Sequence, residues 1–291
     1  IYKLYKGKIE LSTNFNKDQR PRLEQYYLES GTAIVHFSMD KSDNLDINST
    51  SNSNIVTNGL VGWWKLDESS GTDVIDSSGN GYHGILGNGT TTSTYPTLTR
   101  SGYDGSINGA YGFDGGDYVS FPSFPSQIPT GNSAFTISVW INPDSHSTQC
   151  IVAWGTESTA QKTNTLRIES TNKVRHFFNS NDLFATVDDL SNKWTLIVIT
   201  YDGNNRIMYI NGVFVESNTT SSQNVAAQDF YIGRRINNTE RFVGSIDDLR
   251  IYNRAITAEE VFELFYKTRQ SIINKGSLST TITSTFNDYQ L

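Results

Sequence analysis

The segment Asp76-Ser-Ser-Gly-Asn80 has residue types and a spacing that suit the binding of a hard cation. Ca²⁺ takes about six to eight oxygen ligands, and a turn of Asp, Ser, Gly and Asn supplies carboxylate and carbonyl oxygens at short spacing. The alternative is an Asx-turn, in which Asp76 and Asn80 bond their own backbone and no ion is present. Asp114 and Asp117, which flank a Gly-Gly turn, form a weaker second candidate cation site.

No spacing typical of catalysis accompanies these acids. Cys150 is the only cysteine, so an intrachain disulfide is excluded, and it is expected to behave as a small buried apolar residue. The acids between 259 and 263 lie on a predicted helix, where acids of the first turn interact favourably with the helix dipole. The histidines show no metal-ligand spacing and stand at His36, His83, His146 and His176. We therefore predict no catalytic residues and a protein that is not an enzyme.

The composition excludes several further classes of protein. A formal charge of −7 and a pI of about 5.1 give no basic surface for nucleic acid. No apolar run approaches the roughly 20 residues of a membrane-spanning helix. Aromatic residues make up 12% of the chain, so its richness in Asn, Ser and Thr belongs to a folded protein. The chain starts at Ile1 without an apolar leader segment, which indicates either that a leader has been removed or that the sequence given begins later.

Short segments of alternating apolar residues dominate the chain and predict an all-β fold. Residues 134–142 place Phe135, Ile137 and Val139 on one face of a strand. A second strand over 193–201 is followed by a third over 206–210, and Asn211-Gly212 then supplies a type I′ hairpin turn.

The ends of the chain differ from its middle. Thr257-Ala-Glu-Glu260 has the spacing of a capping box and predicts one short C-terminal helix. Residues 42–58 are low in apolar content and indicate a linker. Runs over 1–11, 32–39 and 278–286 are β-prone. We predict an N-terminal extension and linker over 1–58, a main domain over 59–268 and a β-prone tail over 269–291.

From about residue 59 to 267 the chain resembles the laminin-G-like, concanavalin A-like jelly-roll family, in its three-motif bacterial, archaeal and viral branch. Seven motifs in the order of that family carry the resemblance. They are Gly62-Trp-Trp-Lys-Leu-Asp-Glu68, Asp76-Ser-Ser-Gly-Asn-Gly-Tyr-His-Gly84, Phe113-Asp-Gly-Gly-Asp-Tyr-Val-Ser120, Phe135-Thr-Ile-Ser-Val-Trp-Ile-Asn-Pro143, Trp194 to Asp202, Tyr209-Ile-Asn-Gly-Val213 and Gly244-Ser-Ile-Asp-Asp-Leu-Arg-Ile-Tyr-Asn-Arg-Ala255.

The resemblance implies a two-sheet antiparallel jelly-roll sandwich with a structural Ca²⁺. Its ligands here would be Asp76, the region of Asn80, and Asp247 or Asp248. Glucanases of this fold carry two carboxylates on one strand as Glu-x-Asp-x-x-Glu or a shorter form, and that spacing does not occur in this sequence. The tryptophans are expected to pack in the core, except Trp154, which precedes a glycine and a polar stretch and is a candidate for an exposed sugar-binding ring.

The resulting prediction is a non-catalytic, secreted or surface-displayed module that recognises a glycan or a surface protein in adhesion, as part of a larger surface assembly. One alternative is a structural subunit of a filament, an appendage or a virus particle, in which residues 1–40 and 270–291 pair with neighbouring copies. The other alternative is a glycoside hydrolase, which the missing carboxylate pair disfavours. No nucleic acid and no membrane span are expected.

Overall fold

The computed structural model describes residues 3–5, 8–10, 56–220 and 223–275. The chain divides into two units, Ile1–Ser53 and Asn54–Leu291. In the first unit, β1 (Lys3–Tyr5) and β2 (Lys8–Glu10) pair as antiparallel strands. The predicted β-prone runs over 32–39 and 278–286 lie outside the described residues, so self-assembly through the ends of the chain stays a prediction.

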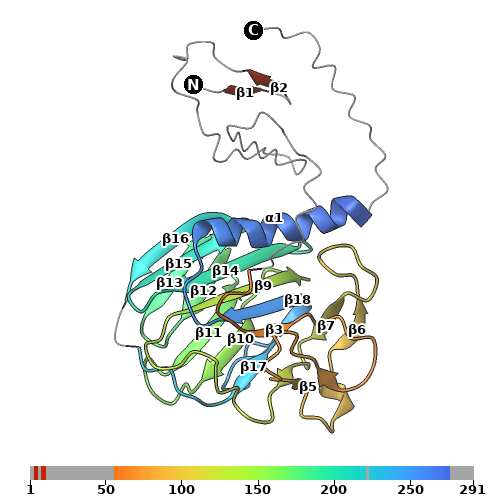
Figure 1. Cartoon of the computed structure of the whole chain (residues 1–291). Helices are drawn as coiled ribbons and strands as arrows, with labels where there is room; N and C mark the ends of the chain where they lie inside the picture. Colours follow the sequence, from red (N-terminus) through yellow and green to blue (C-terminus); the bar gives the residue numbers. More distant parts are fainter. Residues whose placement is uncertain (1–2, 6–7, 11–55, 221–222, 276–291) are drawn as a thin grey trace. The chain divides into compact units, whose positions relative to one another are not determined.

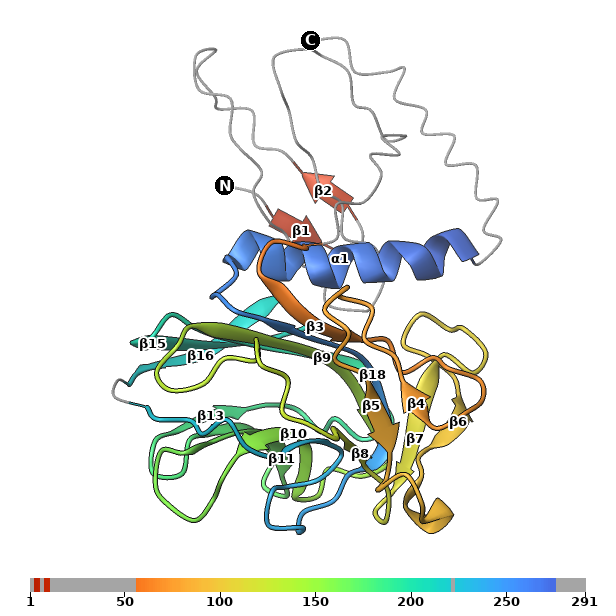
Figure 2. The ribbon, with the colours of Figure 1, turned by 60° about the horizontal axis from the view of Figure 1, so that its bottom comes forward.

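The second unit is built from two antiparallel sheets, and every pairing within them is antiparallel (Figures 1 and 2). The β9 sheet has the order β16 (Val213–Thr219), β15 (Asn205–Ile210), β14 (Thr195–Tyr201), β9 (Phe135–Pro143), β18 (Val243–Tyr252), β7 (Ala110–Asp114) and β6 (Thr97–Arg100), with β3 (Leu60–Trp64) paired to β18. The β10 sheet has the order β13 (Asp182–Thr186), β12 (Lys173–Phe177), β11 (Thr163–Glu169), β10 (Gln149–Gly155), β17 (Phe230–Ile232), β8 (Val119–Ser120), β5 (Gly84–Leu86) and β4 (Asp73–Val74).

The strands predicted from alternation are present. The apolar face of β9 is buried against the opposite sheet, with Ile137, Val139 and Ile141 fully inaccessible to solvent. Asn211 and Gly212 both adopt positive φ, 52° and 81°, as the type I′ turn between β15 and β16 requires. The all-β class and the two-sheet sandwich are therefore confirmed.

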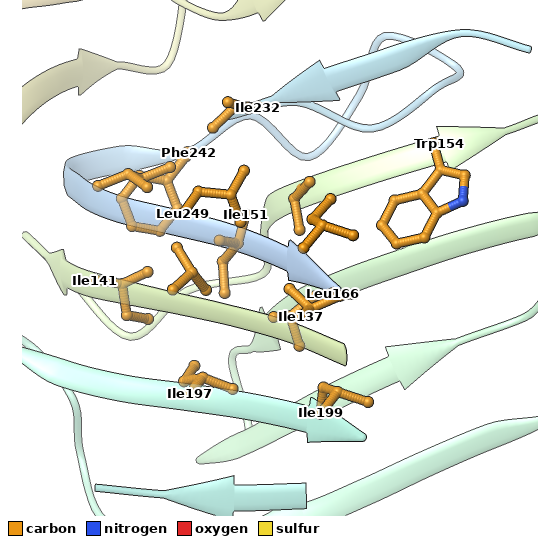
Figure 3. Close-up of a cluster of buried hydrophobic side chains, with 14 of the residues drawn as sticks. Ile137, Ile141, Ile151, Trp154, Leu166, Ile197, Ile199, Ile232, Phe242 and Leu249 are labelled. Carbon is orange, nitrogen blue, oxygen red and sulfur yellow. The ribbon is translucent and has the colours of Figure 1, made fainter. Parts of the chain in front are cut away.

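A continuous hydrophobic core fills the space between the sheets (Figure 3). Ile137, Ile141, Ile197 and Ile199 project into it from the β9 sheet, and Leu166 comes from the β10 sheet. Trp64 anchors one part of the core, where its ring contacts Phe121 and Phe230 edge-on, and its ring also covers the backbone of Gly62. A Cβ at Gly62 would lie far inside van der Waals contact with that ring, so the glycine of the Gly-Trp-Trp motif makes room for the second tryptophan.

The predicted helix is α1 (Ala258–Lys275), and it lies across the β9 sheet (Figures 1 and 2). Its start is the expected capping box, because the Glu260 amide donates to Thr257 Oγ1 at 3.3 Å and the Thr257 amide donates to Glu260 Oε2 at 2.8 Å. Phe265 of the helix stacks on Trp140 of β9, with ring centroids 5.9 Å apart. A short 3-10 turn, η1 (Thr92–Thr94), precedes β6. None of the described helices is long and apolar enough to cross a membrane.

Candidate functional site

The turn that carries Asp76 is held by hydrogen bonds to its carboxylate. Asp76 Oδ1 accepts from the amides of Trp63 and Ser78, each at 2.9 Å. Asp76 Oδ2 accepts from Ser78 Oγ at 2.8 Å and from the Tyr82 amide at 3.0 Å. The Asn80 side chain donates to Val61 O at 3.1 Å. Both carboxylate oxygens of Asp76 are thus occupied by donors of the chain itself, as in an Asx-turn.

The acidic pair of β18 lies next to this turn, and Trp63 connects the two. Trp63 Nε1 donates to Asp248 Oδ1 at 2.6 Å, while the Trp63 backbone amide donates to Asp76. Asp248 also forms a buried ion pair with Arg250 at 3.0 Å. Asp247 accepts from the Tyr103 amide at 3.1 Å, and burial, with the neighbouring Asp248 charge, raises the pKa of Asp247 to about 9.

These residues do not form a calcium coordination shell in this arrangement. The oxygens of Asp76 and Asp248 face N–H and O–H donors, which a cation would have to displace. Among the described residues, no three His, Cys, Asp or Glu side chains come together as metal ligands. Trp63 contacts both Asp76 and Asp248, but the two carboxylates act as acceptors of hydrogen bonds, so this arrangement does not fit the calcium site that the resemblance implies. The effect of a chelator on stability tests that site.

Asp114 and Asp117 also act on the backbone of their own turn. Asp117 Oδ2 accepts from the Asp114 amide at 2.9 Å, and Asp114 Oδ1 accepts from the Gly116 amide at 2.7 Å. Burial raises the pKa of Asp117 to about 6. The pair therefore stabilises the turn between β7 and β8, in the manner of Asx-turns.

The prediction that Trp154 exposes its ring is wrong. Trp154 is fully buried, and Figure 3 shows its ring at the edge of the hydrophobic cluster. Its Nε1 donates to Pro129 O at 3.0 Å, and its ring contacts Phe135 and Phe230 edge-on. The polar stretch that follows Trp154 suggested a loop. Strand β10 in fact continues to Gly155, and its alternation directs the Trp154 side chain into the core.

The two sheets differ in what covers their outer faces. On the β9 sheet, Trp140 is buried beneath Phe265 of α1 and beneath Tyr103, whose ring stacks on it at 4.7 Å. On the β10 sheet, alternation directs Val174 and His176 inward and Arg175 and Phe177 outward. We call the outward side of the β10 sheet the β10-sheet face; its outward side chains include Arg167, Arg175, Phe177, Phe184 and Tyr231.

A chain of ion pairs crosses the β10-sheet face. Arg175 pairs with Glu169 at 3.1 Å and with Asp182 on the neighbouring strand. Arg235 pairs with Glu157 at 2.6 Å and with Glu240 at 2.7 Å. Arg167 connects the two halves, because it contacts both Glu169 and Glu240. These carboxylates are all engaged by arginine, and Phe177 lies beneath the guanidinium groups of Arg167, Arg175 and Arg235.

Next to this network, two tyrosines and two arginines form what we call the tyrosine–arginine cluster: Tyr118, Tyr231, Arg234 and Arg241. The rings of Tyr118 and Tyr231 meet edge-on at 6.0 Å. Arg234 Cζ lies 3.8 Å from the centre of the Tyr231 ring and 4.5 Å from that of Tyr118. Arg241 Cζ lies 5.3 Å from the Tyr118 ring. Tyr231 and the two arginines are partly accessible to solvent, so the cluster reaches the surface.

A separate polar group is buried inside the sandwich. Arg206 of β15 reaches across the core and donates to His176 Nδ1 of β12 at 2.9 Å. His176 Nε2 lies 2.8 Å from Asn164 Oδ1. All three side chains are inaccessible to solvent. Burial lowers the pKa of His176 well below its usual value, and the Arg206 charge adds to this shift. This group joins the two sheets and is a structural element.

Two packed antiparallel sheets in this strand order define a jelly-roll domain of the concanavalin A-like type. Residues 113–262, about half of the chain, match the Laminin_G_3 model of the concanavalin A-like lectin/glucanases superfamily. The chain belongs to this superfamily.

Two curated relatives are usherins. Usherin of Rattus norvegicus is 25% identical over 172 residues, which are 52% of this chain and 3% of that protein. Usherin of Homo sapiens is 25% identical over 165 residues, which are 50% of this chain and 3% of that protein. The chain therefore corresponds to a small part of these relatives.

Solved structures share the fold. Domain 4 of AbnA, an extracellular arabinanase of Geobacillus stearothermophilus in complex with arabinotriose, has a TM-score of 0.53 and 20% identity over 70% of this chain and 97% of that one. The botulinum neurotoxin serotype G binding domain has a TM-score of 0.55 and 18% identity over 72% of this chain and 51% of that one. The serotype D ligand-binding domain in complex with N-acetylneuraminic acid has a TM-score of 0.52 and 15% identity over 72% and 51%.

Sequence reasoning did not identify the β10-sheet face. The signal is present in Lys173-Val-Arg-His-Phe177, where charged and aromatic residues alternate with residues that face the core. The tyrosine–arginine cluster could not be found in this way, because Tyr118 is far from Tyr231 and Arg241 in the sequence. The pairing of β8 with β17 brings Tyr118 to Tyr231, and the pairing of β7 with β18 brings Arg241 to the same turn.

Proposed function

We propose that this domain is a non-catalytic glycan-recognition module, displayed outside the cell or on a surface, that binds its ligand on the β10-sheet face beside the tyrosine–arginine cluster. The observation that carries the proposal is the difference between the two outer faces. On the β9 sheet, α1 and Tyr103 cover Trp140, whereas the other sheet presents arginine and aromatic side chains that reach the surface. Aromatic rings beside charged hydrogen-bonding groups suit recognition of a sugar, which has both apolar C–H faces and hydroxyl groups.

Relatives of the same fold support a binding role. The structures of the AbnA domain and of the serotype D domain are complexes with a sugar, although their low identity to this chain shows the fold alone. Membership of a superfamily that includes lectins and the match to usherin favour a secreted or surface-exposed location.

A hydrolytic role is less well supported than binding. A retaining or inverting glycosidase needs one carboxylic acid and one carboxylate on either side of the scissile bond. The carboxylates described in the ion-pair network, those of Glu157, Glu169, Asp182 and Glu240, all contact arginine. These carboxylates are held in ion pairs, so the network contains no pair of free carboxyl groups that could act as acid and base.

A glycan array probed with the full chain tests the proposal, followed by affinity measurement for each glycan that binds. Tyr231→Ala is expected to reduce affinity by about tenfold, since loss of an aromatic contact costs on the order of 1 kcal/mol or more. Phe214→Ala is the matched control, because Phe214 is 56% exposed on β16 of the other sheet. The proposal fails if no glycan binds, or if Phe214→Ala weakens binding and Tyr231→Ala does not.

A further inference from the structure

Arg234 is a partly buried arginine that forms no ion pair among the described residues. Its Nε is buried and has no hydrogen-bond partner, and the described part of the chain offers it no carboxylate within ion-pair distance. The adjacent Arg235 contacts two glutamates. Arg241 is also engaged, because its guanidinium donates to Gly116 O and to Asn238 Oδ1, each at 2.5 Å.

The two tyrosine rings hold the guanidinium of Arg234 in place. With Cζ at 3.8 Å from one ring centre and 4.5 Å from the other, stacking restricts its movement without using its N–H donors. A guanidinium that is already positioned loses less conformational entropy when it binds a ligand. The cost of holding a half-buried charge without a counter-ion is then offset when an anion arrives.

We infer that Arg234, packed against the rings of Tyr118 and Tyr231, is the anchor of a subsite for a carboxylate-bearing sugar, such as a uronic or sialic acid residue. This inference rests on the proposed function and adds the class of ligand. The planar fork of a guanidinium matches a carboxylate through two parallel N–H to oxygen bonds. The tyrosine rings are covered by Arg234 and Arg241, so the cluster offers a cationic edge in preference to a bare ring for a neutral sugar.

Asp229 is an acidic group beside this cluster. Asp229 is exposed, and its Oδ1 lies 3.5 Å from the Tyr231 hydroxyl. A carboxylate beside Tyr231 repels an anion bound at the cluster, and Asp229 forms no ion pair with Arg234 among the described residues. Replacing Asp229 by Asn keeps the shape and removes the charge, so Asp229→Asn is expected to tighten binding, and the effect is expected to shrink at high salt.

Surface plasmon resonance on the immobilised full chain tests the inference with matched probes. Sialyllactose is compared with lactose, and tri-galacturonate with its neutral methyl ester. Sulfated lactose and an acidic peptide are the alternative anions. At least one carboxylated sugar is expected to bind about tenfold or more tightly than its neutral partner, as loss of charged hydrogen bonds implies. Arg234→Ala should abolish this preference, and Arg234→Lys should remove most of it, because an ammonium cannot make the two parallel bonds.

Arg100→Ala is the matched control, since Arg100 carries the same charge, is 46% exposed and lies on β6. Its removal should leave the preference unchanged, and circular dichroism should show that each variant is folded. The inference is overturned if sulfated lactose or the peptide binds more tightly than the carboxylated sugars, or if Arg234→Ala retains the preference. Equal binding of neutral and acidic sugars overturns the inference and leaves the proposed function standing, whereas absence of any sugar binding overturns both.

Discussion

Because His176 is buried in its neutral form, we expect the free energy of unfolding of this domain to decrease as the pH falls below about 6.5. Arg206 is always a donor, so the nitrogen that it contacts, His176 Nδ1, must accept. The proton of the neutral ring therefore lies on Nε2 and is donated to Asn164 Oδ1. Burial disfavours the charged imidazolium and is the main reason why the pKa of His176 is lowered in the folded state; the charge of Arg206, against which protonation would place a second N–H, adds to the shift.

The magnitude follows from linkage. The unfolded chain takes up a proton at His176 as the pH falls below the ordinary pKa of 6.5, whereas the folded chain takes it up only at a much lower pH. The free energy of unfolding then falls by about 1.4 kcal/mol for each pH unit below that value. Over two pH units this one residue removes at most about 3 kcal/mol of stability, the limit reached when His176 stays neutral in the folded state at pH 4.5. Above pH 7.5 its contribution no longer changes with pH.

Urea unfolding from pH 4.5 to 8 measures this effect. His176→Asn keeps an amide near the position of Nδ1 but cannot titrate, so it should be less stable than the wild type at pH 8 and should approach or exceed it at pH 4.5. The control is Phe113→Leu, which shortens a buried ring that packs on Phe242 and should destabilise the protein equally at each pH. A constant difference between the wild type and His176→Asn across this range would refute the reasoning.

Three further outcomes are expected. Gly62→Ala should destabilise the fold by about 1–3 kcal/mol and alter tryptophan fluorescence, because the added methyl group displaces the Trp64 ring; an unchanged melting temperature would contradict the packing described. Thr257→Ala should cost about 1 kcal/mol in chemical unfolding by removing the cap of α1, while Thr257→Ser should cost less because it keeps the hydroxyl. Addition of a chelator should leave the melting temperature unchanged, since the Asp76 and Asp248 carboxylates are occupied by donors, and a clear decrease would show that a cation displaces them.

Local patterns were sufficient to predict much of the fold. The alternation in β9, the Asn211-Gly212 turn and the capping box at Thr257 each depend on residues close together in the chain, and each is present in the structure. Seven motifs in order identified the jelly roll for the same reason, because each motif is a local solution to a strand or a turn. The Asx-turn alternative at Asp76 was also visible, since it involves residues only a few positions apart.

The exposure of a side chain was decided only by the tertiary structure. Trp154 precedes a glycine and a polar loop, yet it is buried because strand β10 faces it toward Phe135 on the other sheet. The contact of Arg234 with the rings of both Tyr118 and Tyr231 depends on the pairing of β8 with β17. Sequence by itself determined which segments form strands and turns, since backbone preference and alternation are local. Which charges are compensated and which rings reach solvent was decided by strands far apart in the chain, because burial and ion pairing depend on distances that only the packed sheets set.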